Sequence, residues 1–443
     1  MSGANPAKPT APNSSDDAYL QKSQNSGTNM MIIAVLIVIV LVLAVVAGAY
    51  AAGWIGGKTT NTTTTVYKNN TTKTEPKWLP DCGGSLTAGG STFVYPLMAV
   101  WTVNYAGLPC NTSASGGSSS TQINYQAVGS GSGITSLTNN LYVFGASDAP
   151  LSYAQTQALK NPVVTMPDSA GAVTIIYNLK VTNATGVAKP LHLTGNVLAQ
   201  IYYGNITKWN DTRITTLNPG LTIPGTTITV EHRSDGSGTS FAFTTFLSDS
   251  NATWKSKIGA STSPAWPTGL GQKGSEGVAG AVASTSGAIG YDELNYAEEE
   301  GVNLEIAEVQ NPVGNYILPT VVDTAYAVQN ASNLPSPTGN WSGYSIINGG
   351  GAGTYPIATL TYLMVYTDLD KAYSGEFTQA QAAALVSFLW WIVHTGQNNS
   401  AGLFYVPLPT VLVTLDETAI GDIQYNGQAL VSHPPAGYTD GLT

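Results

Sequence analysis

The sequence predicts an α/β fold preceded by one N-terminal transmembrane helix, and three observations support this prediction. Runs rich in β-branched and aromatic residues alternate with runs whose apolar residues recur at helical spacing. Several of the strand-like runs lead into helices through short turns of glycine, serine and threonine. An uncharged, apolar run occupies residues 30–52. The alternation of strands and helices indicates an α/β architecture with crossover helices.

Composition restricts the class of protein further. The chain has 443 residues, which is long enough for one large or two medium domains with a hydrophobic core. Charged residues make up only 9% of it and the formal net charge is -10, so it lacks the basic face of a nucleic-acid-binding protein. Its hydrophobic fraction of 43% is unlike that of a disordered chain. We therefore expect a mostly globular protein with no nucleic-acid partner.

The N-terminal apolar run predicts a membrane anchor. A bilayer core of about 30 Å requires about 20 apolar residues, and the run is long enough to cross it. We predict a cytoplasmic tail over 1–29 and a transmembrane anchor over 30–55. A cleaved signal peptide is the main alternative, because Ala49-Tyr50-Ala51 resembles a cleavage site. A buried core helix is a weaker alternative, since the run is apolar on every face.

The region after the anchor predicts an extracellular protein. Residues 56–81 are rich in Thr and Asn and lack an apolar period, which is typical of a solvated stalk. A disulfide between Cys82 and Cys110 would suit an oxidising compartment, with two buried free thiols as the alternative. We expect a single-pass protein of the cell membrane with its C-terminal domain outside. Its glycosylation acceptors would be Asn61, Asn69, Asn70, Asn111, Asn183, Asn205, Asn210, Asn251, Asn330, Asn340 and Asn398.

Elements of the globular part follow from periodicity. The strand-like runs are TQINYQAVG (121–129) and GAVTIIYNL (171–179). Apolar residues at helical spacing predict helices over 94–106, 194–204, 238–250 and 377–396. The last of these helices is expected to end at Gly396.

Three polar turns lie where a strand-like run passes into a helix. They are TAGGSTF (87–93), VGSGSGITSL (128–137) and RSDGSGTSFAF (233–243). Glycines allow the backbone to approach a ligand closely, and the unpaired N–H groups of a helix start attract an anion. For any single turn, ordinary helix capping without a ligand is the alternative interpretation.

Two charged positions strengthen the prediction of an anion site. Asp148 lies among small and apolar residues in VFGASDAPL (143–151). A carboxylate is unfavourable in such a setting unless it has a structural or functional role. A helix-capping aspartate is the alternative. Arg233 is one of only 16 Lys and Arg residues in the chain, and Asp235 follows it closely. A local ion pair that holds a turn is the alternative for these two residues.

A series of strings resembles the phosphate-binding protein of the high-affinity phosphate ABC transporter. In chain order they are AGGSTF, INYQAVGSGSG, FGASDAPLS, KWND, LNPGL, RSDGSGTSFAFT, WPTGLGQKGSEGVA and GAIGYDELNYA, and YVPLPTVLV (405–413) closes the series. The resemblance extends from about residue 84 to 413 and is weakest through 300–355.

The resemblance implies a two-lobed periplasmic-binding-protein fold of type II, the Venus-flytrap fold, with two hinge crossovers. Lobe I would comprise 82–170 and 356–443, and lobe II would comprise 171–355. It also implies an extracellular protein that captures inorganic phosphate between the lobes and delivers it to the permease subunits of an ABC transporter.

The resemblance also implies the ligands of the phosphate ion, carried over position by position. Asp148 would select a protonated oxyanion, since an ionised carboxylate only accepts hydrogen bonds; phosphate carries a proton and sulfate does not. Asp235 would orient the arginine. The family usually has an acidic residue where this chain has Val143, and often a second arginine where it has His232. The implied phosphate ligands are Thr92, Phe93, Ser130, Asp148, Arg233, Ser237, Gly238 and Thr239.

Two other functions compete with phosphate capture. A secreted, phosphatase-like enzyme could use the same turns to bind a phosphoryl group. However, the four histidines, at 192, 232, 394 and 433, show no metal-ligand spacing, so we expect no enzyme activity, no metal and no cofactor. A surface glycoprotein with a vestigial anion site is the other alternative.

Overall fold

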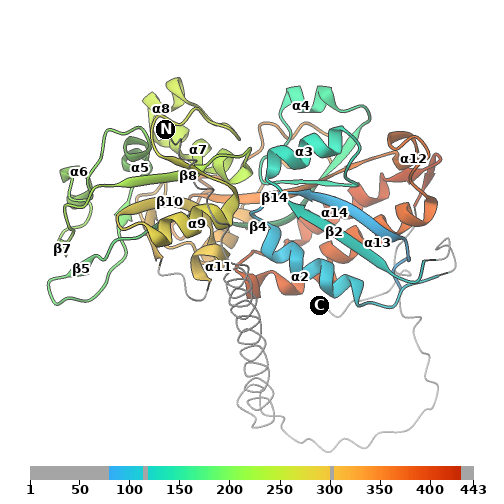
Figure 1. Ribbon diagram of the computed structural model, residues 1–443, viewed down its shortest axis with the longest axis horizontal. Helices are drawn as coiled ribbons and strands as arrows, with labels where there is room; N and C mark the ends of the chain where they lie inside the picture. Colours follow the sequence, from blue (N-terminus) through green and yellow to red (C-terminus); the bar gives the residue numbers. More distant parts are fainter. Residues whose placement is uncertain (1–78, 113–117, 300–303, 431–443) are drawn as a thin grey trace, which may run out of the picture. The chain divides into compact units, whose positions relative to one another are not determined.

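The computed structural model describes residues 79–112, 118–299 and 304–430 (Figure 1). The predicted tail (1–29), the anchor (30–55) and nearly all of the stalk (56–81) lie outside these ranges. Within the described ranges, none of the helices combines the length and the apolar character that crossing a membrane requires.

The elements alternate along the chain as an α/β fold requires. The helices are α2 Tyr95–Ala106, α3 Ser130–Thr138, α4 Tyr153–Ala158, α5 Gly195–Tyr202, α6 Thr212–Thr215, α7 Gly238–Ser250, α8 Ala252–Lys257, α9 Gly274–Ser284, α10 Leu294–Glu298, α11 Val321–Gln329, α12 Leu369–Ala372, α13 Gln379–Val393 and α14 Thr410–Gly421. The strands are β1 Gly84–Gly90, β2 Thr121–Ala127, β3 Gly145–Ser147, β4 Val163–Tyr177, β5 Thr182–Asn183, β6 His192–Leu193, β7 Leu221–Thr222, β8 Thr229–Arg233, β9 Leu270–Gln272, β10 Ala288–Glu293, β11 Glu305–Ile306, β12 Glu308–Gln310, β13 Tyr316–Ile317, β14 Ala358–Tyr366, β15 Gln424–Tyr425 and β16 Gln428–Ala429.

One mixed sheet organises the fold. Its strand order is β2-β1-β3-β14-β4-β10-β8-β9, and β11 pairs with β4. Strand β1 pairs in parallel with β2 and β3 at one end, and β8 pairs in parallel with β9 and β10 at the other. In Figure 1, α7 and α9 accompany β8 and β10 on one side of β4, whereas α2, α3 and α13 accompany β2 on the other. The parallel pairs require crossovers, which the helices provide.

Strand β4 connects the two halves of the sheet. It pairs with β14 from Val163 to Ala172 and with β10 from Val173 to Tyr177. The expected strand over 171–179 covers only its second part. The first part escaped detection because Pro167 and Asp168 interrupt the strand pattern. A bulge lies there, since Tyr362 pairs with Pro167 and Thr361 with Ser169, so Asp168 has no partner in the ladder.

The predicted helices fall close to α2, α5, α7 and α13. The predicted end of the last one is wrong by three residues, because α13 ends at Val393. His394 leaves helical geometry (φ -115, ψ -99), and Thr395–Asn399 continues as a 3₁₀ turn. Gly396 belongs to this turn, where its carbonyl accepts a hydrogen bond from Trp101 Nε1 at 2.7 Å. Helix α13 therefore ends before Gly396, because this glycine takes part in a tertiary contact with Trp101 instead of terminating the helix.

A disulfide joins Cys82 and Cys110, so neither is a free thiol. It links the segment before β1 to the segment after α2. It therefore holds the start of β1, the strand that ends at the first polar turn.

Candidate anion-binding site

The polar turns of the sequence meet between the two halves of the sheet, where the carboxyl ends of β1 and β3 face that of β8. Strands β1, β3 and β8 end at Gly90, Ser147 and Arg233, and the predicted ligands follow directly. Helices α3 and α7 begin at Ser130 and Gly238 beside them. In open α/β sheets, ligands bind beyond the carboxyl ends of the strands. The topology thus gathers distant segments at the place where a ligand is expected.

The first turn is organised by Ser91, which the prediction did not include. Its Oγ accepts the backbone N–H of Phe93 at 3.0 Å and donates to Asp148 Oδ1. The Phe93 ring is fully buried and packs edge-on against Tyr405, with ring centroids 6.1 Å apart. Phe93 therefore anchors the turn in the core, while Ser91 links that turn to the carboxylate.

The second and third turns touch through their backbones. Gly131 N donates to Gly236 O at 2.8 Å. Gly238 N donates to Ser130 Oγ at 3.0 Å. Gly129 has φ +90, and a Cβ there would lie 2.2 Å from Asp235 Oδ2. Glycine is required at this position both for the backbone conformation and for the close approach.

Asp148 is buried between the turns, with 2% of its surface exposed. Thr239 Oγ1 donates to its Oδ2 at 3.4 Å. Burial raises the pKa of Asp148 to about 6, although the Ser91 hydroxyl and the charge of Arg233 oppose that rise. Above pH 6 the group is mainly an ionised carboxylate, which can accept hydrogen bonds but not donate them.

Arg233 is 3% exposed and pairs with Asp235 in a fork. Its Nε donates to Asp235 Oδ1 at 2.8 Å and its Nη2 to Oδ2 at 2.5 Å. Burial opposes the charge of the guanidinium, but Asp235 holds the pKa of Arg233 above its usual value. Asp235 also accepts Gly274 N at 3.1 Å. The carboxylate therefore fixes the guanidinium plane, as expected of an orienting residue.

The third turn caps α7. Ser237 Oγ accepts Ser240 N at 3.1 Å and so satisfies one of the unpaired N–H groups of the helix. A Cβ on Gly238 would lie 2.6 Å from Asp148 N, so a larger residue would separate α7 from the carboxylate. Gly238 therefore permits the contact between β3 and α7.

Ser275 is a second residue that sequence reasoning missed. Its Oγ lies 3.0 Å from Thr92 Oγ1 and accepts from Arg233 Nη1 at 3.3 Å. It therefore joins the first turn to the arginine. Both Ser91 and Ser275 occur in strings that carry the resemblance, AGGSTF and GQKGSEG, but no local pattern connects either of them to its partner.

Strand β10 contributes two buried carboxyl groups that were also missed, Asp292 and Glu293. Glu293 Oε2 accepts the Tyr405 hydroxyl at 3.0 Å, and Tyr296 OH donates to Thr92 O at 3.0 Å. These groups lie behind the first turn and Arg233. In the sequence they look like an ordinary acidic pair, which is usually exposed.

The two departures from the family pattern have structural roles. His232 Nδ1 lies 3.0 Å from Arg233 O, and the ring stacks on Trp266 with centroids 4.9 Å apart. Val143 is buried in the hydrophobic core. The His232 side chain thus contacts the backbone of the predicted ligand Arg233, on the carbonyl rather than the guanidinium.

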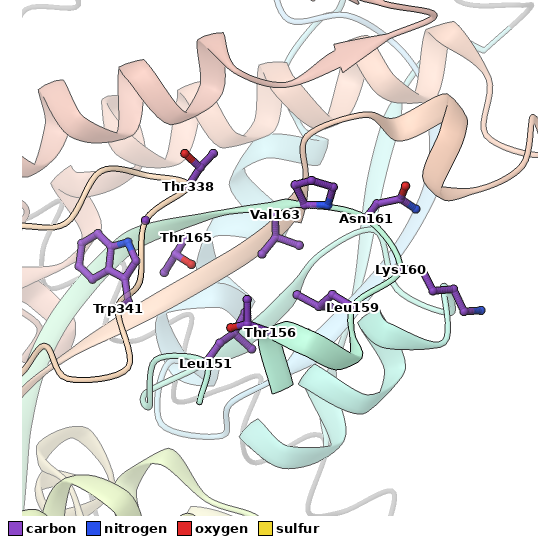
Figure 2. Close-up of a pocket in the computed structure, with 11 residues that line it drawn as sticks. Leu151, Thr156, Leu159, Lys160, Asn161, Val163, Thr165, Thr338 and Trp341 are labelled. Carbon is purple, nitrogen blue, oxygen red and sulfur yellow. The ribbon is translucent and has the colours of Figure 1, made fainter. Parts of the chain in front are cut away.

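A separate pocket of about 320 Å³ lies beside the start of β4 (Figure 2). Leu151, Val163 and Trp341 line it, and it contains none of the predicted anion ligands. The one cation of its lining, Lys160, is exposed and points away from the other labelled side chains in Figure 2. A buried anion needs desolvated donors, so this pocket is not the candidate site.

The residues with described coordinates contain no group of three or more His, Cys, Asp or Glu side chains arranged to hold a metal ion. The chemistry at the strand ends is instead that of hydroxyls, backbone N–H groups, one guanidinium and carboxyl groups. Such a set suits an oxyanion that carries a proton.

Comparison with known proteins agrees with this chemistry. Residues 59–393 match the model of the PBP superfamily domain. The chain is 36% identical to the phosphate-binding protein PstS of Xylella fastidiosa (strain Temecula1) over 333 residues, which cover 74% of this chain and 82% of that protein. It is 33% identical to the PstS of Methanocaldococcus jannaschii over 322 residues, which cover 68% and 79%.

Solved structures show the same fold. The high affinity periplasmic phosphate-binding protein PfluDING, bound with phosphate, superposes with a TM-score of 0.55 at 20% identity, covering 76% of this chain and 93% of that one. The phosphate-binding protein of Stenotrophomonas maltophilia gives 0.53 at 18% identity, covering 75% and 92%. The fold is therefore the two-lobed α/β fold of periplasmic binding proteins, and the chain belongs to the PstS family of phosphate-binding proteins.

Proposed function

We propose that this protein captures inorganic phosphate between its two lobes and delivers it to the permease of an ABC transporter. The observation that carries the proposal is the convergence of three turns, Asp148 and Arg233 on one point between the two halves of the sheet. Its relatives at 33–36% identity are named phosphate-binding proteins, which supports the same ligand.

The ligand contacts follow from the donors at this point. Arg233 would supply charge-assisted hydrogen bonds, which are roughly twice as strong as neutral ones. The hydroxyls of Thr92, Ser130 and Thr239 and the N–H groups at the starts of α3 and α7 would complete the shell. Asp148 would accept the proton of the phosphate and so reject sulfate. Phe93 and Ser237 would hold the turns, since their backbone N–H groups donate to Ser91 Oγ and Thr262 O. The Ser237 hydroxyl, whose oxygen accepts Ser240 N, would still have a hydrogen to donate to the ion.

Opening and closing would proceed about the two crossovers. The change of partner within β4, between Ala172 and Val173, supports a boundary between lobe I (82–170 and 356–443) and lobe II (171–355). The contacts of Ser130 with Gly238 and of Gly131 with Gly236 would bridge the lobes. Release would require breaking these neutral hydrogen bonds, each with a net value of about 0.5–1.5 kcal/mol, and the bond from Thr239 to the Asp148 carboxylate.

The proposal places the binding domain outside the cell, tethered by the apolar run over 30–55. Six of the predicted glycan acceptors are exposed, which is compatible with modification there: Asn111, Asn205, Asn210, Asn330, Asn340 and Asn398. The disulfide between Cys82 and Cys110 suits the same oxidising compartment. Protease protection of intact cells with an antibody to the C-terminal domain would test this orientation.

Calorimetric titration of the purified full-length protein with phosphate and with sulfate tests the function. We expect one phosphate bound per chain and much weaker binding of sulfate. The absence of heat with phosphate, or equal affinity for the two anions, would refute the proposal. We further propose that the ion is released unchanged, so turnover of a chromogenic phosphate ester by clean protein would contradict a binding role.

A further inference from the structure

Asp292 lies beside Arg233 on the same face of the sheet. Strand β10 runs parallel to β8 with Ala288 opposite Thr229 and Ile289 opposite Val230, and the same register carried to the strand ends places Asp292 opposite Arg233. The aromatic rings support this placement. His232 and Tyr291 both stack on Trp266 on one face, so the next residues, Arg233 and Asp292, point to the other face.

One carboxylate oxygen of Asp292 makes no hydrogen bond within the part of the chain that the structure describes. The side chain is 1% exposed, and Oδ1 accepts Glu293 N at 2.9 Å. Oδ2 is buried without a hydrogen bond. An ionised carboxylate oxygen in this state is costly, because water is excluded and no donor reaches it at full hydrogen-bond geometry. The Ser275 hydroxyl and the Ala279 N–H lower the pKa of the group, but by less than burial raises it. A proton on the group removes most of that cost.

The groups around Asp292 make the balance of charge unfavourable for ionisation. On β8, Arg233 is already neutralised by Asp235. On its own strand lies the buried Glu293, and on α10 lies Tyr296. Helix α9 contributes the neutral Ser275 and the exposed Glu276, and Asp148 after β3 is the remaining carboxyl group. Three buried carboxyl groups thus surround one cation whose charge is already matched.

Burial acts in the same direction on these acids. It raises the pKa of Asp292 to about 7, with the charge of Arg233 opposing the rise. It raises the pKa of Glu293 well above the usual range. An anion placed beside Arg233 adds a further negative charge, which favours the protonated form of Asp292 still more.

We propose that Asp292 makes phosphate capture proton-dependent: it holds a proton when the anion is bound, and the site therefore binds phosphate more weakly as the solution becomes alkaline. Asp292 acts through Ser275 and Arg233 rather than by touching the anion, so it is a positioning residue. The proton comes from solvent and returns to it on release, and no other bond changes. This inference rests on the proposed function of the same site.

The test is calorimetric titration with phosphate from pH 5.5 to 8.5, in pairs of buffers that differ in ionisation enthalpy. For each proton taken up per ion bound, the affinity falls up to tenfold per pH unit above pH 7. In Asp292→Asn, which keeps the size but cannot titrate, we expect a shallower pH profile and up to one proton fewer. The ionisation of phosphate itself is common to both proteins, so their difference reports Asp292.

The control is Glu276→Gln, which removes an exposed acid from α9 and is expected to keep the wild-type profile. An unchanged profile and proton count in Asp292→Asn would overturn the inference and leave the proposed function intact, whereas no phosphate binding by the wild type at any pH would overturn the proposed function. If Asp292→Asn does not fold, infrared difference spectra of the wild type, recorded with and without phosphate, test whether a carboxyl group gains a proton on binding. Adding phosphate at pH 8 should increase the carbonyl band of a protonated carboxyl group, and no increase would refute the proposal.

Discussion

Gly238 donates its backbone N–H to Ser130 Oγ at 3.0 Å, although the two residues are 108 positions apart. This bond joins the start of α7 to the start of α3, and Asp148 lies between them. Gly238 also has no room for a side chain, because a Cβ would lie within 2.7 Å of Asp148 Cα. The geometry of the predicted anion site therefore depends on the closeness of two helix starts.

Gly238→Ala should weaken phosphate binding. Forcing a methyl group against the Asp148 backbone costs about 1–3 kcal/mol, which corresponds to a loss of roughly 5- to 150-fold in affinity if the strain is confined to the closed form. Gly280→Ala on α9 is the matched control, because a Cβ there meets nothing within 4 Å. The control should keep the wild-type dissociation constant, and equal affinities of the two variants would contradict the steric argument.

Arg233→Lys should reduce phosphate affinity at least tenfold. Lysine cannot make the two bonds to Asp235 and the bond to Ser275 at once, and charge-assisted bonds contribute about 1.5–3 kcal/mol each. Arg213 forms a similar fork with Asp211, with Nε–Oδ1 and Nη2–Oδ2 both at 2.8 Å, but it is exposed. Arg213→Lys should leave affinity unchanged and cost less than about 1 kcal/mol of stability. Titration and urea unfolding of both variants check this contrast.

Discrimination against sulfate should depend on pH through Asp148. Because burial raises its pKa to about 6, the group is an acceptor at pH 7.5 but carries a proton at pH 5, where it can donate to a sulfate oxygen. Competition titrations should therefore show the phosphate preference shrinking as the pH falls from 7.5 to 5. Asp148→Asn, which can donate at every pH, should be less selective at pH 7.5, by on the order of a few kcal/mol. Selectivity that survives this substitution would contradict the assigned role.

Stability should decline as the pH rises from 4 to 8 through Asp168. Burial raises the pKa of Asp168 to about 8, although nearby N–H groups and the Thr361 hydroxyl oppose the rise. Among the described residues, no donor reaches either of its carboxylate oxygens at full hydrogen-bond geometry. The folded protein therefore keeps a proton that the unfolded chain releases near pH 4, so the free energy of unfolding falls by up to about 1.4 kcal/mol per pH unit in this window. Asp168→Asn should flatten the slope in urea unfolding series. Asp368→Asn, at the surface cap of α12, is the control and should retain the wild-type slope over this window.

Much of the fold could be predicted from local pattern. Helices α2, α5 and α7 were predicted from apolar residues at helical spacing, and α5 and α7 also begin at a capping hydroxyl, that of Thr194 and Ser237. Strand β4 was only half recognised, because Pro167 and Asp168 break the pattern within a bulge whose partner, β14, lies far along the chain. The end of α13 was displaced from Gly396 because Trp101 binds that carbonyl. Such long-range contacts leave no trace in the local sequence.

Some residues of the candidate site could likewise be predicted from local sequence, and others could not. The glycine turns, Asp148 and the neighbouring pair of Arg233 and Asp235 are visible in the sequence, since turn chemistry and charge in an apolar setting are local properties. Ser91, Ser275 and Asp292 are not visible, because their roles arise only when the ends of β1 and β10 and the start of α9 come together between the two halves of the sheet. A hydrogen bond or a desolvated charge depends on neighbours in space. For this chain, residue types therefore indicate which chemistry is available, and packing sets which groups touch, which are buried and which keep a proton.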